Sequence, residues 1–192
     1  MGGSSKLRGG LYAICVAQVL TSAEKQIFDF LGYMWLPILC NFLNIVFVIF
    51  CCFGVWQRKR NYIVSYIIWT VIFTSWNVFV ICYYMEVGTL RRTQDMLSFG
   101  TGSFSWFLEN GYGCNAEFFH NVTAIESVPD RNTGFYPIRP SKVTGCMVEY
   151  QMVETVHALI HLILALLGLG LACGLLMEFK NEVRKTKDPE LY

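Results

Sequence analysis

The sequence predicts an all-α integral membrane protein with four transmembrane helices and a large, disulfide-stapled extracellular loop between the third and fourth helices. Residues 35–56 and 62–85 contain no Asp, Glu, Lys or Arg. Each segment exceeds the roughly 20 helical residues that cross a bilayer core. The whole chain is 54% hydrophobic and only 15% charged, which is typical of a small multi-span membrane protein. A soluble helical hairpin would need a polar face, which these two segments lack.

The basic hinge at 57–61, between the second and third predicted helices, sets the expected orientation. Its cations are Arg58, Lys59 and Arg60, and Lys and Arg in short loops stay in the cytoplasm. With both termini on the same side, nine of the fifteen Lys and Arg residues become cytoplasmic. Arg91 and Arg92 follow the third helix and argue the other way, but they belong to a long loop, where the rule is weaker.

Residues 1–8 are a predicted cytoplasmic N-terminus, and 9–24 form a short first transmembrane helix that contains Gln18. The alternative is a cleaved signal peptide, with Lys6 and Arg8 as its basic region and 21–23 as a small-residue cleavage site. Both alternatives give the same topology, because the chain from Glu24 onward begins outside in either case.

Residues 25–34 are predicted to form a short extracellular loop at the membrane interface. Lys25 and Asp29 interleave with apolar residues there, so the segment is too polar to span a bilayer and too apolar to lie free in water. Trp35 then contributes to an aromatic belt, and Pro37 lies in the first turn of the second helix, where a missing N–H costs little.

The predicted large extracellular loop, 86–151, contains a glycosylation sequon at Asn121 and two cysteines, Cys114 and Cys146. The sequon is usable only outside the cell, and the same compartment favours disulfides. A Cys114–Cys146 bridge would close a loop of about 33 residues, worth roughly 3–4 kcal/mol in the chain-entropy model; two free thiols are the alternative. A fourth transmembrane helix at 152–179 and a cytoplasmic tail at 180–192 complete the chain.

Several polar residues are expected at similar depth in the bilayer, a short way below its outer boundary. They are Gln18, Asn41, Asn44, Asn77, His157 and His161. Polar side chains at that depth should face the bundle and not the lipid, so they predict a polar layer that links the four helices. Interhelical hydrogen bonding is the favoured interpretation, and an ion or proton site is the alternative.

Glu154, His157 and His161 share one helical face by their spacing, and such residues can bind Zn²⁺. The sequence has no His-Glu-x-x-His pattern, so we expect a structural polar face and neither a metal nor a cofactor. No set of nucleophile, base and orienting residue is visible, so we expect no enzyme activity. The net charge of +1 gives no field that would attract nucleic acid.

Two further pairs of residues have two interpretations each. Gly170 and Gly174 are a small-xxx-small pair that allows close helix approach, either inside the bundle or against a partner's helix. Cys51 and Cys52, near the inner end of the second helix, are candidates for palmitoylation or buried structural cysteines.

Blocks of sequence in a fixed order resemble a known family. They are 26–33 with Trp35 and 37–39, 76–82, 109–111 with 113–114, 145–146 with 149–151, and Glu154 and His157 with 164–166. Together they resemble the NKAIN family, proteins that interact with the beta subunit of the Na⁺/K⁺-transporting ATPase. The resemblance extends from about residue 18 to residue 173. Ser4 departs from the family's Met-Gly-x-Cys start, which removes a candidate acylation site.

The resemblance implies a multi-pass plasma-membrane protein with four spans and a large extracellular loop, and the charge distribution places both termini in the cytoplasm. The resemblance also implies a non-catalytic accessory role, in which the chain binds the pump's beta subunit and modulates sodium and potassium transport. A small cation channel with the polar layer in its path is one alternative. A tetraspanin-like membrane organiser is another, but tetraspanins carry Cys-Cys-Gly in the large loop, whereas Cys51 and Cys52 here lie in a helix and precede Phe53.

Overall fold

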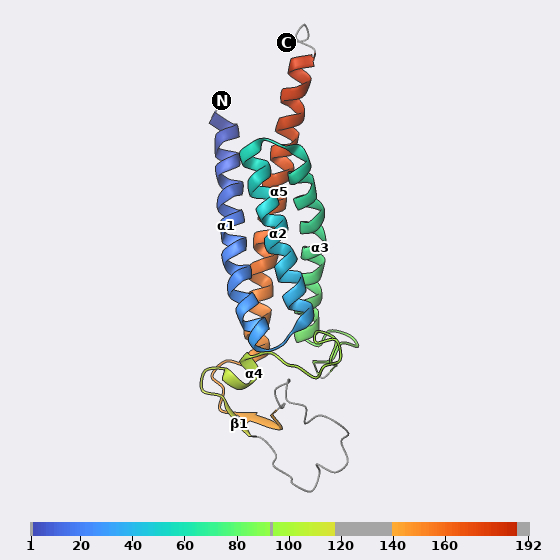
Figure 1. The fold of residues 1–192 in the computed structure, drawn as a ribbon. Coiled ribbons are helices and arrows are strands. Elements are labelled where there is room, and N and C mark those ends of the chain that lie inside the picture. Colours follow the sequence, from blue (N-terminus) through green and yellow to red (C-terminus); the bar gives the residue numbers. More distant parts are fainter. Residues whose placement is uncertain (1, 93, 118–139, 188–192) are drawn as a thin grey trace.

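The computed structural model describes residues 2–92, 94–117 and 140–187. Its helices are α1 (Gly2–Leu31), α2 (Trp35–Gln57), α3 (Arg60–Tyr84), α4 (Phe107–Asn110) and α5 (Tyr150–Lys187), and its strands are β1 (Asn115–Glu117) and β2 (Lys142–Thr144). The four long helices form an antiparallel bundle, in which α1 and α3 each pack against both α2 and α5 (Figure 1).

The two ends of the bundle differ in what they carry (Figure 1). The start of α1, the turn between α2 and α3, and the end of α5 lie together at what we call the hinge end. The chain between α3 and α5 lies at the opposite end, which we call the loop end. There α4 and the β1–β2 pair sit beyond the helices.

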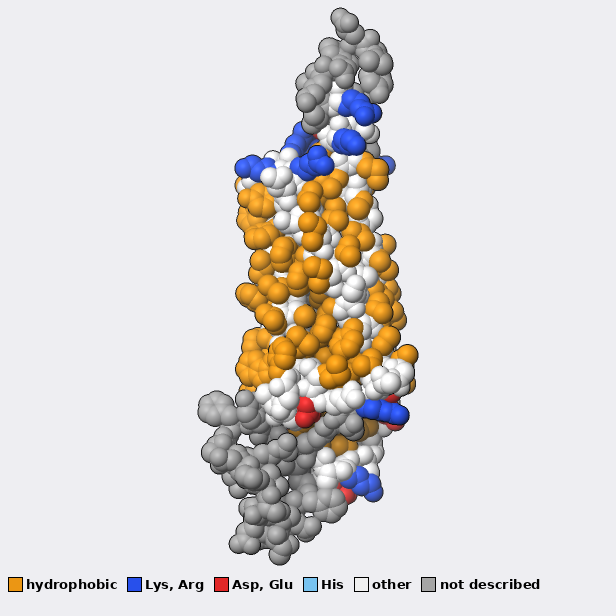
Figure 2. Space-filling view, turned by 90° about the vertical axis from the view of Figure 1, so that its right-hand side faces the viewer, with side chains coloured by type: hydrophobic (Ala, Val, Ile, Leu, Met, Phe, Trp, Pro, Cys, Tyr) orange, Lys and Arg blue, Asp and Glu red, His pale blue; other side chains and the backbone are white. Residues whose placement is uncertain are grey.

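Among the residues that the structure describes, three helical segments are long and apolar enough to cross a membrane: Trp35–Gln57, Arg60–Tyr84 and Tyr150–Glu182. Figure 2 shows a broad hydrophobic band on the face of the bundle that it draws, with Lys and Arg side chains gathered beyond it at the hinge end. The described part of the chain is therefore mostly helical, with three candidate membrane spans. α1 is not in this group, and four of its polar side chains, those of Gln18, Ser22, Lys25 and Asp29, are buried in the bundle.

The predicted interfacial loop at 25–34 is wrong for most of its length, because α1 continues through it to Leu31. The turn that remains is 32–34, where the Gly32 N–H donates to the Phe28 carbonyl and the Met34 N–H donates to the Asp29 carbonyl. Lys25 and Asp29 were expected at the membrane surface, but they are buried among partners from α2 and α5. At the other terminus, α5 extends to Lys187, so residues 180–187 of the predicted tail are helical.

The hinge half of the bundle has an apolar core. Its fully buried members are Leu11, Cys15, Val48, Cys51, Ile63, Ala172 and Leu175. Gly54 lets α2 and α3 approach closely beside this core, because a Cβ at that position would lie 2.9 Å from Ile63 Cγ1. A second apolar cluster, which includes Met34, Val80, Tyr84, Leu97 and Ala158, lies at the loop end.

Candidate functional site

A buried ionic cluster joins α1 to α5 near the loop end. Lys25 Nζ lies 2.9 Å from Glu154 Oε2 and also pairs with Asp29 Oδ1, one turn further along α1. None of the three side chains is more than 9% exposed. Charges are removed from water at high cost and persist only with close partners, so this cluster ties the two helices into one arrangement.

Two neutral side chains complete the ionic cluster. Asn41 Nδ2 of α2 donates to Asp29 Oδ2 at 2.7 Å, and Ser105 Oγ of the loop donates to Glu154 Oε1. The cluster therefore binds α1, α2, α5 and the connection between α3 and α5 together. With both carboxylates ionised, one cation faces two anions, so the polar donors are needed to offset the excess negative charge.

A cavity of about 20 Å³ lies beside the ionic cluster, lined in part by Lys25, Asn41, Asn77, Glu154 and His161. It has room for about one water molecule. His161 is buried, and within the described part of the chain its Nε2 has no hydrogen-bond partner. Its ring packs edge-on against Phe73, with centroids 5.7 Å apart.

The polar contacts continue from the ionic cluster toward the middle of the bundle. Asn44 Nδ2 donates to Ser22 Oγ at 2.9 Å, and Trp69 Nε1 donates to Asn44 Oδ1 at 3.2 Å. Deeper still, the Tyr66 hydroxyl donates to Gln18 Oε1 at 3.0 Å. Beyond this bond the apolar core of the hinge half begins, so the polar side chains occupy one half of the bundle.

The residues expected to form a polar layer do not all behave alike. Gln18, Asn41, Asn44, Asn77 and His161 are buried inside the bundle. Asn77 Nδ2 donates to the Phe73 carbonyl of its own helix at 2.7 Å, so it makes a local hydrogen bond. His157 is only partly buried, stacks on Phe107 and lies 3.4 Å from Glu24 Oε1.

Lys25, Asp29 and Glu154 were not predicted as members of the polar layer, although they are its most strongly charged part. The sequence does contain a pattern that indicates their burial, because Gln18, Ser22, Lys25 and Asp29 recur on one face of α1 at helical spacing. A polar stripe on an otherwise apolar helix indicates a face turned toward the bundle.

The zinc alternative at Glu154, His157 and His161 has little geometric support. The Glu154 oxygens are engaged by Lys25 and Ser105, and His157 points toward Glu24. Over residues 2–92, 94–117 and 140–187, no group of three or more His, Cys, Asp or Glu side chains is arranged to hold a metal ion.

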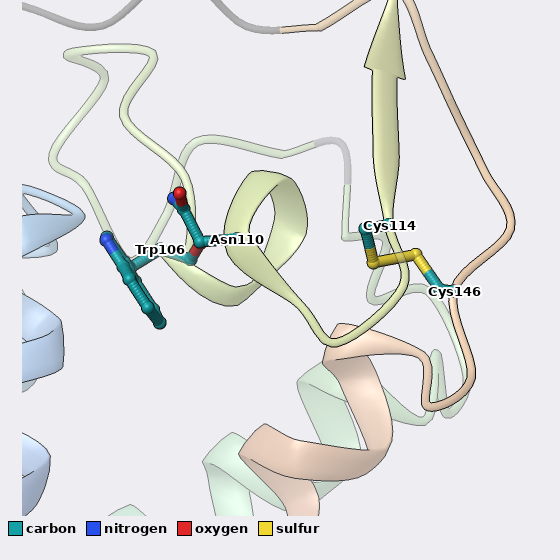
Figure 3. The surroundings of a disulfide bond; sticks show 4 residues. All are labelled: Trp106, Asn110, Cys114 and Cys146. Atoms are coloured by element: carbon teal, nitrogen blue, oxygen red, sulfur yellow. A yellow bond between two sulfur atoms is a disulfide. The ribbon is translucent and has the colours of Figure 1, made fainter.

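The loop end carries the disulfide between Cys114 and Cys146 (Figure 3). Cys114 directly precedes β1, and Cys146 follows β2. The strands pair antiparallel, with Asn115 opposite Thr144. The predicted glycosylation site, Asn121, lies outside the described residues.

The loop is also fixed to the bundle. Tyr83 donates its hydroxyl to the Gln94 carbonyl at 2.5 Å, and the Leu36 N–H donates to the Leu97 carbonyl at 3.1 Å. Gly32 must lack a Cβ, since one would lie 2.7 Å from the Phe104 carbonyl oxygen. The loop segment from residue 94 to residue 106 therefore covers the ends of α1, α2 and α3.

One surface ion pair closes the turn after α3. Arg92 Nη2 donates to Glu86 Oε2 at 3.2 Å, and this hydrogen bond lowers the pKa of Glu86 and raises the pKa of Arg92. A carboxyl with a lowered pKa stabilises the fold above its unfolded pKa, and the contribution is lost as the pH falls through the lowered value.

Two sets of predicted residues lie toward the hinge end. Gly174 lies where a Cβ would contact Leu7 at 3.4 Å, whereas a Cβ at Gly170 would meet nothing within 4 Å. Gly174 therefore packs inside the bundle and Gly170 faces outward. Cys51 is fully buried in the hinge-half core, which fits the structural alternative, while Cys52 is only partly buried.

Comparisons with known proteins agree over most of the chain. The family model described as Na,K-ATPase Interacting protein (NKAIN) matches residues 2–186. A Drosophila melanogaster protein named sodium/potassium-transporting ATPase subunit beta-1-interacting protein is 46% identical over 159 residues, which are 83% of this chain and 23% of the relative. The chain thus spans less than a quarter of that relative's length, and no solved structure matches it. The chain belongs to the Na,K-ATPase interacting protein family.

Proposed function

We propose that this chain is a non-catalytic, multi-pass protein of the plasma membrane that binds the beta subunit of the Na⁺/K⁺-transporting ATPase and modulates sodium and potassium transport. The observation that carries the proposal is the 46% identity to a relative named for binding that subunit, over 83% of this chain. The family model, which extends over residues 2–186, supports the same assignment.

The proposal includes four membrane spans, in which α1 is added to the three candidate spans described above. It also includes a hinge end that faces the cytoplasm. Burial of Lys25 and Asp29 supports a spanning α1, because the polar face of that helix is covered by protein. The cations at the hinge end support the orientation. The Cys114–Cys146 staple and a glycan on Asn121 then belong to the extracellular side, where both are chemically allowed.

Co-purification tests the partner. The full chain, expressed with the pump and extracted in a mild detergent, is expected to recover the beta subunit. A single-span membrane protein unrelated to the pump serves as the specificity control and should stay behind. Recovery of the control and the beta subunit in equal amounts, or of neither, would contradict the proposal.

Gly170 offers a sharper version of this experiment, because it is an exposed small residue on the outer face of α5. Small residues let a second helix approach closely, so Gly170→Leu should reduce recovery of the beta subunit if α5 is the contact. Gly9→Leu is the matched control, since Gly9 is equally open on α1. Equal recovery with wild type and Gly170→Leu would move the contact to the loop end.

Asn121 tests the orientation independently of any partner. We expect peptide N-glycosidase to shift the mobility of the chain made in mammalian cells, and Asn121→Gln to abolish that shift. A folded, membrane-inserted chain that is never glycosylated at Asn121 would place the loop end in the cytoplasm.

The channel alternative receives less support from the packing. Polar side chains extend from the ionic cluster to the Tyr66–Gln18 hydrogen bond, and the buried side chains beyond it are mainly apolar. An ion path would have to cross that apolar half. Ion flux through vesicles that contain the purified chain alone would favour the channel over the accessory role.

A further inference from the structure

A pocket of about 260 Å³ opens at the hinge end, between the α2–α3 turn and α5. Its lining residues are Arg58, Arg60, Phe179, Lys180 and Glu182, and we call it the hinge pocket. The volume lies just below the roughly 300–1,000 Å³ of pockets for drug-sized ligands. The lining carries three cations and one anion, which is a strong bias toward an anionic ligand.

The ion pairs of the described residues lie away from these three cations. Among the residues that the structure describes, no ion pair involves Arg58, Arg60 or Lys180. A fourth cation lies next to the pocket, because the Arg8 guanidinium of α1 sits 5.5 Å from the centre of the Phe179 ring. Cationic side chains from the hinge and from α1, α3 and α5 therefore lie at or next to the hinge pocket.

The backbone at the hinge pocket also favours an anion. Lys59 is the N-cap residue of α3 and makes no side-chain capping bond, and the first turn of α3 contains no acid. The first amide N–H groups of a helix have no partner within it, and a phosphate or carboxylate satisfies them well. The N-terminus of α3 begins at Arg60, which is itself a lining residue.

Arg58 is held in a backbone conformation that an arginine disfavours. It caps α2 with φ 54° and ψ 33°, in the left-handed region where glycine is the usual residue. This cap residue ends α2 directly before α3 begins, and its side chain lines the hinge pocket. Here the side chain supplies charge to the hinge pocket.

The hinge pocket lies at the edge of the hydrophobic band, which is the level at which lipid headgroups are expected. The hydrophobic band of the bundle ends where the Lys and Arg side chains begin (Figure 2). Trp56, directly before the hinge, is 78% exposed, as expected for an aromatic residue at the membrane–water boundary. Basic pockets between membrane helices at this level suit phosphorylated lipid headgroups.

We propose that the hinge pocket binds the phosphorylated headgroup of an anionic membrane lipid, with Arg58, Arg60 and Lys180 as the phosphate ligands and the first turn of α3 as a further donor. The acyl chains then extend along the hydrophobic band. This site does not depend on the partner proposed above, since it uses only residues of this chain.

The test uses the purified full chain in phosphatidylcholine nanodiscs, titrated with phosphatidylinositol 4,5-bisphosphate carrying a fluorescent acyl chain. Loss of two surface cations should weaken binding by about 30-fold, so Arg58→Gln with Arg60→Gln is the test variant. Lys6→Gln with Arg184→Gln is the matched control. It removes the same charge at the same end from exposed residues that do not line the pocket, and it should keep affinity within about threefold of wild type.

Arg58→Gly separates lipid binding from folding. Glycine relieves the strained cap, so the melting temperature should be unchanged or raised while lipid affinity falls. An equal loss of lipid affinity in the test variant and in the control variant would overturn the proposal. It would show that the lipid is attracted by the overall positive charge of the hinge end and not by the hinge pocket. Soluble inositol trisphosphate that binds as tightly as the lipid would overturn it in favour of a free polyphosphate site.

Discussion

The two halves of the bundle differ in their buried contacts, because the loop half adds an ionic cluster to its apolar packing. At the loop end, Lys25, Asp29 and Glu154 form a buried ionic cluster with Asn41 and Ser105. At the hinge end, aliphatic side chains pack around Tyr66 together with Ala172, Cys15 and Cys51. Ion pairs and hydrogen bonds require particular partners, whereas apolar packing depends on volume and shape. The loop half should therefore tolerate fewer substitutions and fix the register of the helices.

The largest expected effect is the loss of the central cation. Lys25→Met leaves Asp29 and Glu154 as buried carboxylates without their counter-charge, and breaking such a pair costs about 3–5 kcal/mol. Tryptophan fluorescence during unfolding in mixed detergent micelles gives the free energy of unfolding that checks this value.

A triple variant controls for the shape of the Lys25 side chain. Adding Asp29→Asn and Glu154→Gln to Lys25→Met removes both buried charges, so most of the lost stability should return. A triple variant that is no more stable than Lys25→Met would show that the ionic cluster is not the dominant contact of the loop half.

The effects expected at the boundary between the halves are intermediate. A Cβ at Gly168 would lie 2.1 Å from the Tyr66 hydroxyl, which is buried and bonded to Gln18. Gly168→Ala should therefore displace Tyr66 and cost about 1–3 kcal/mol, measured by the same unfolding assay.

Gly170→Ala is the matched control for Gly168→Ala, because nothing lies within 4 Å of its Cβ. It should leave stability unchanged or slightly raised, since alanine favours helix over glycine. In a double-mutant cycle with Tyr66→Phe, which removes the displaced hydroxyl, Gly168→Ala should cost less than it does alone. Strict additivity would contradict the predicted clash.

The same contrast explains what the sequence could predict. The apolar segments 35–56 and 62–85 differ from α2 and α3 by at most two residues at each end, because a long apolar run with a basic hinge has few alternatives. The extent of α1 was missed. Lys25 and Asp29 make that stretch look interfacial, and only the partners on α2 and α5 allow its burial. Those partners are far away in the sequence, so local pattern could not reveal them.

The smallest expected effects distinguish hydrogen bonds between helices from those within one helix. Asn44 bonds Ser22 of α1 and Trp69 of α3, while Asn77 donates to the Phe73 carbonyl of its own helix. Asn44→Leu should cost about 1–2 kcal/mol, because it leaves the buried Ser22 hydroxyl and the half-buried Trp69 N–H, on two other helices, without their partner. Asn77→Leu should cost about 0.6 kcal/mol or less, the average for a polar contact in a membrane bundle. Equal costs in the unfolding assay would mean that burial alone, and not the bond across helices, sets the worth of a polar residue in the loop half.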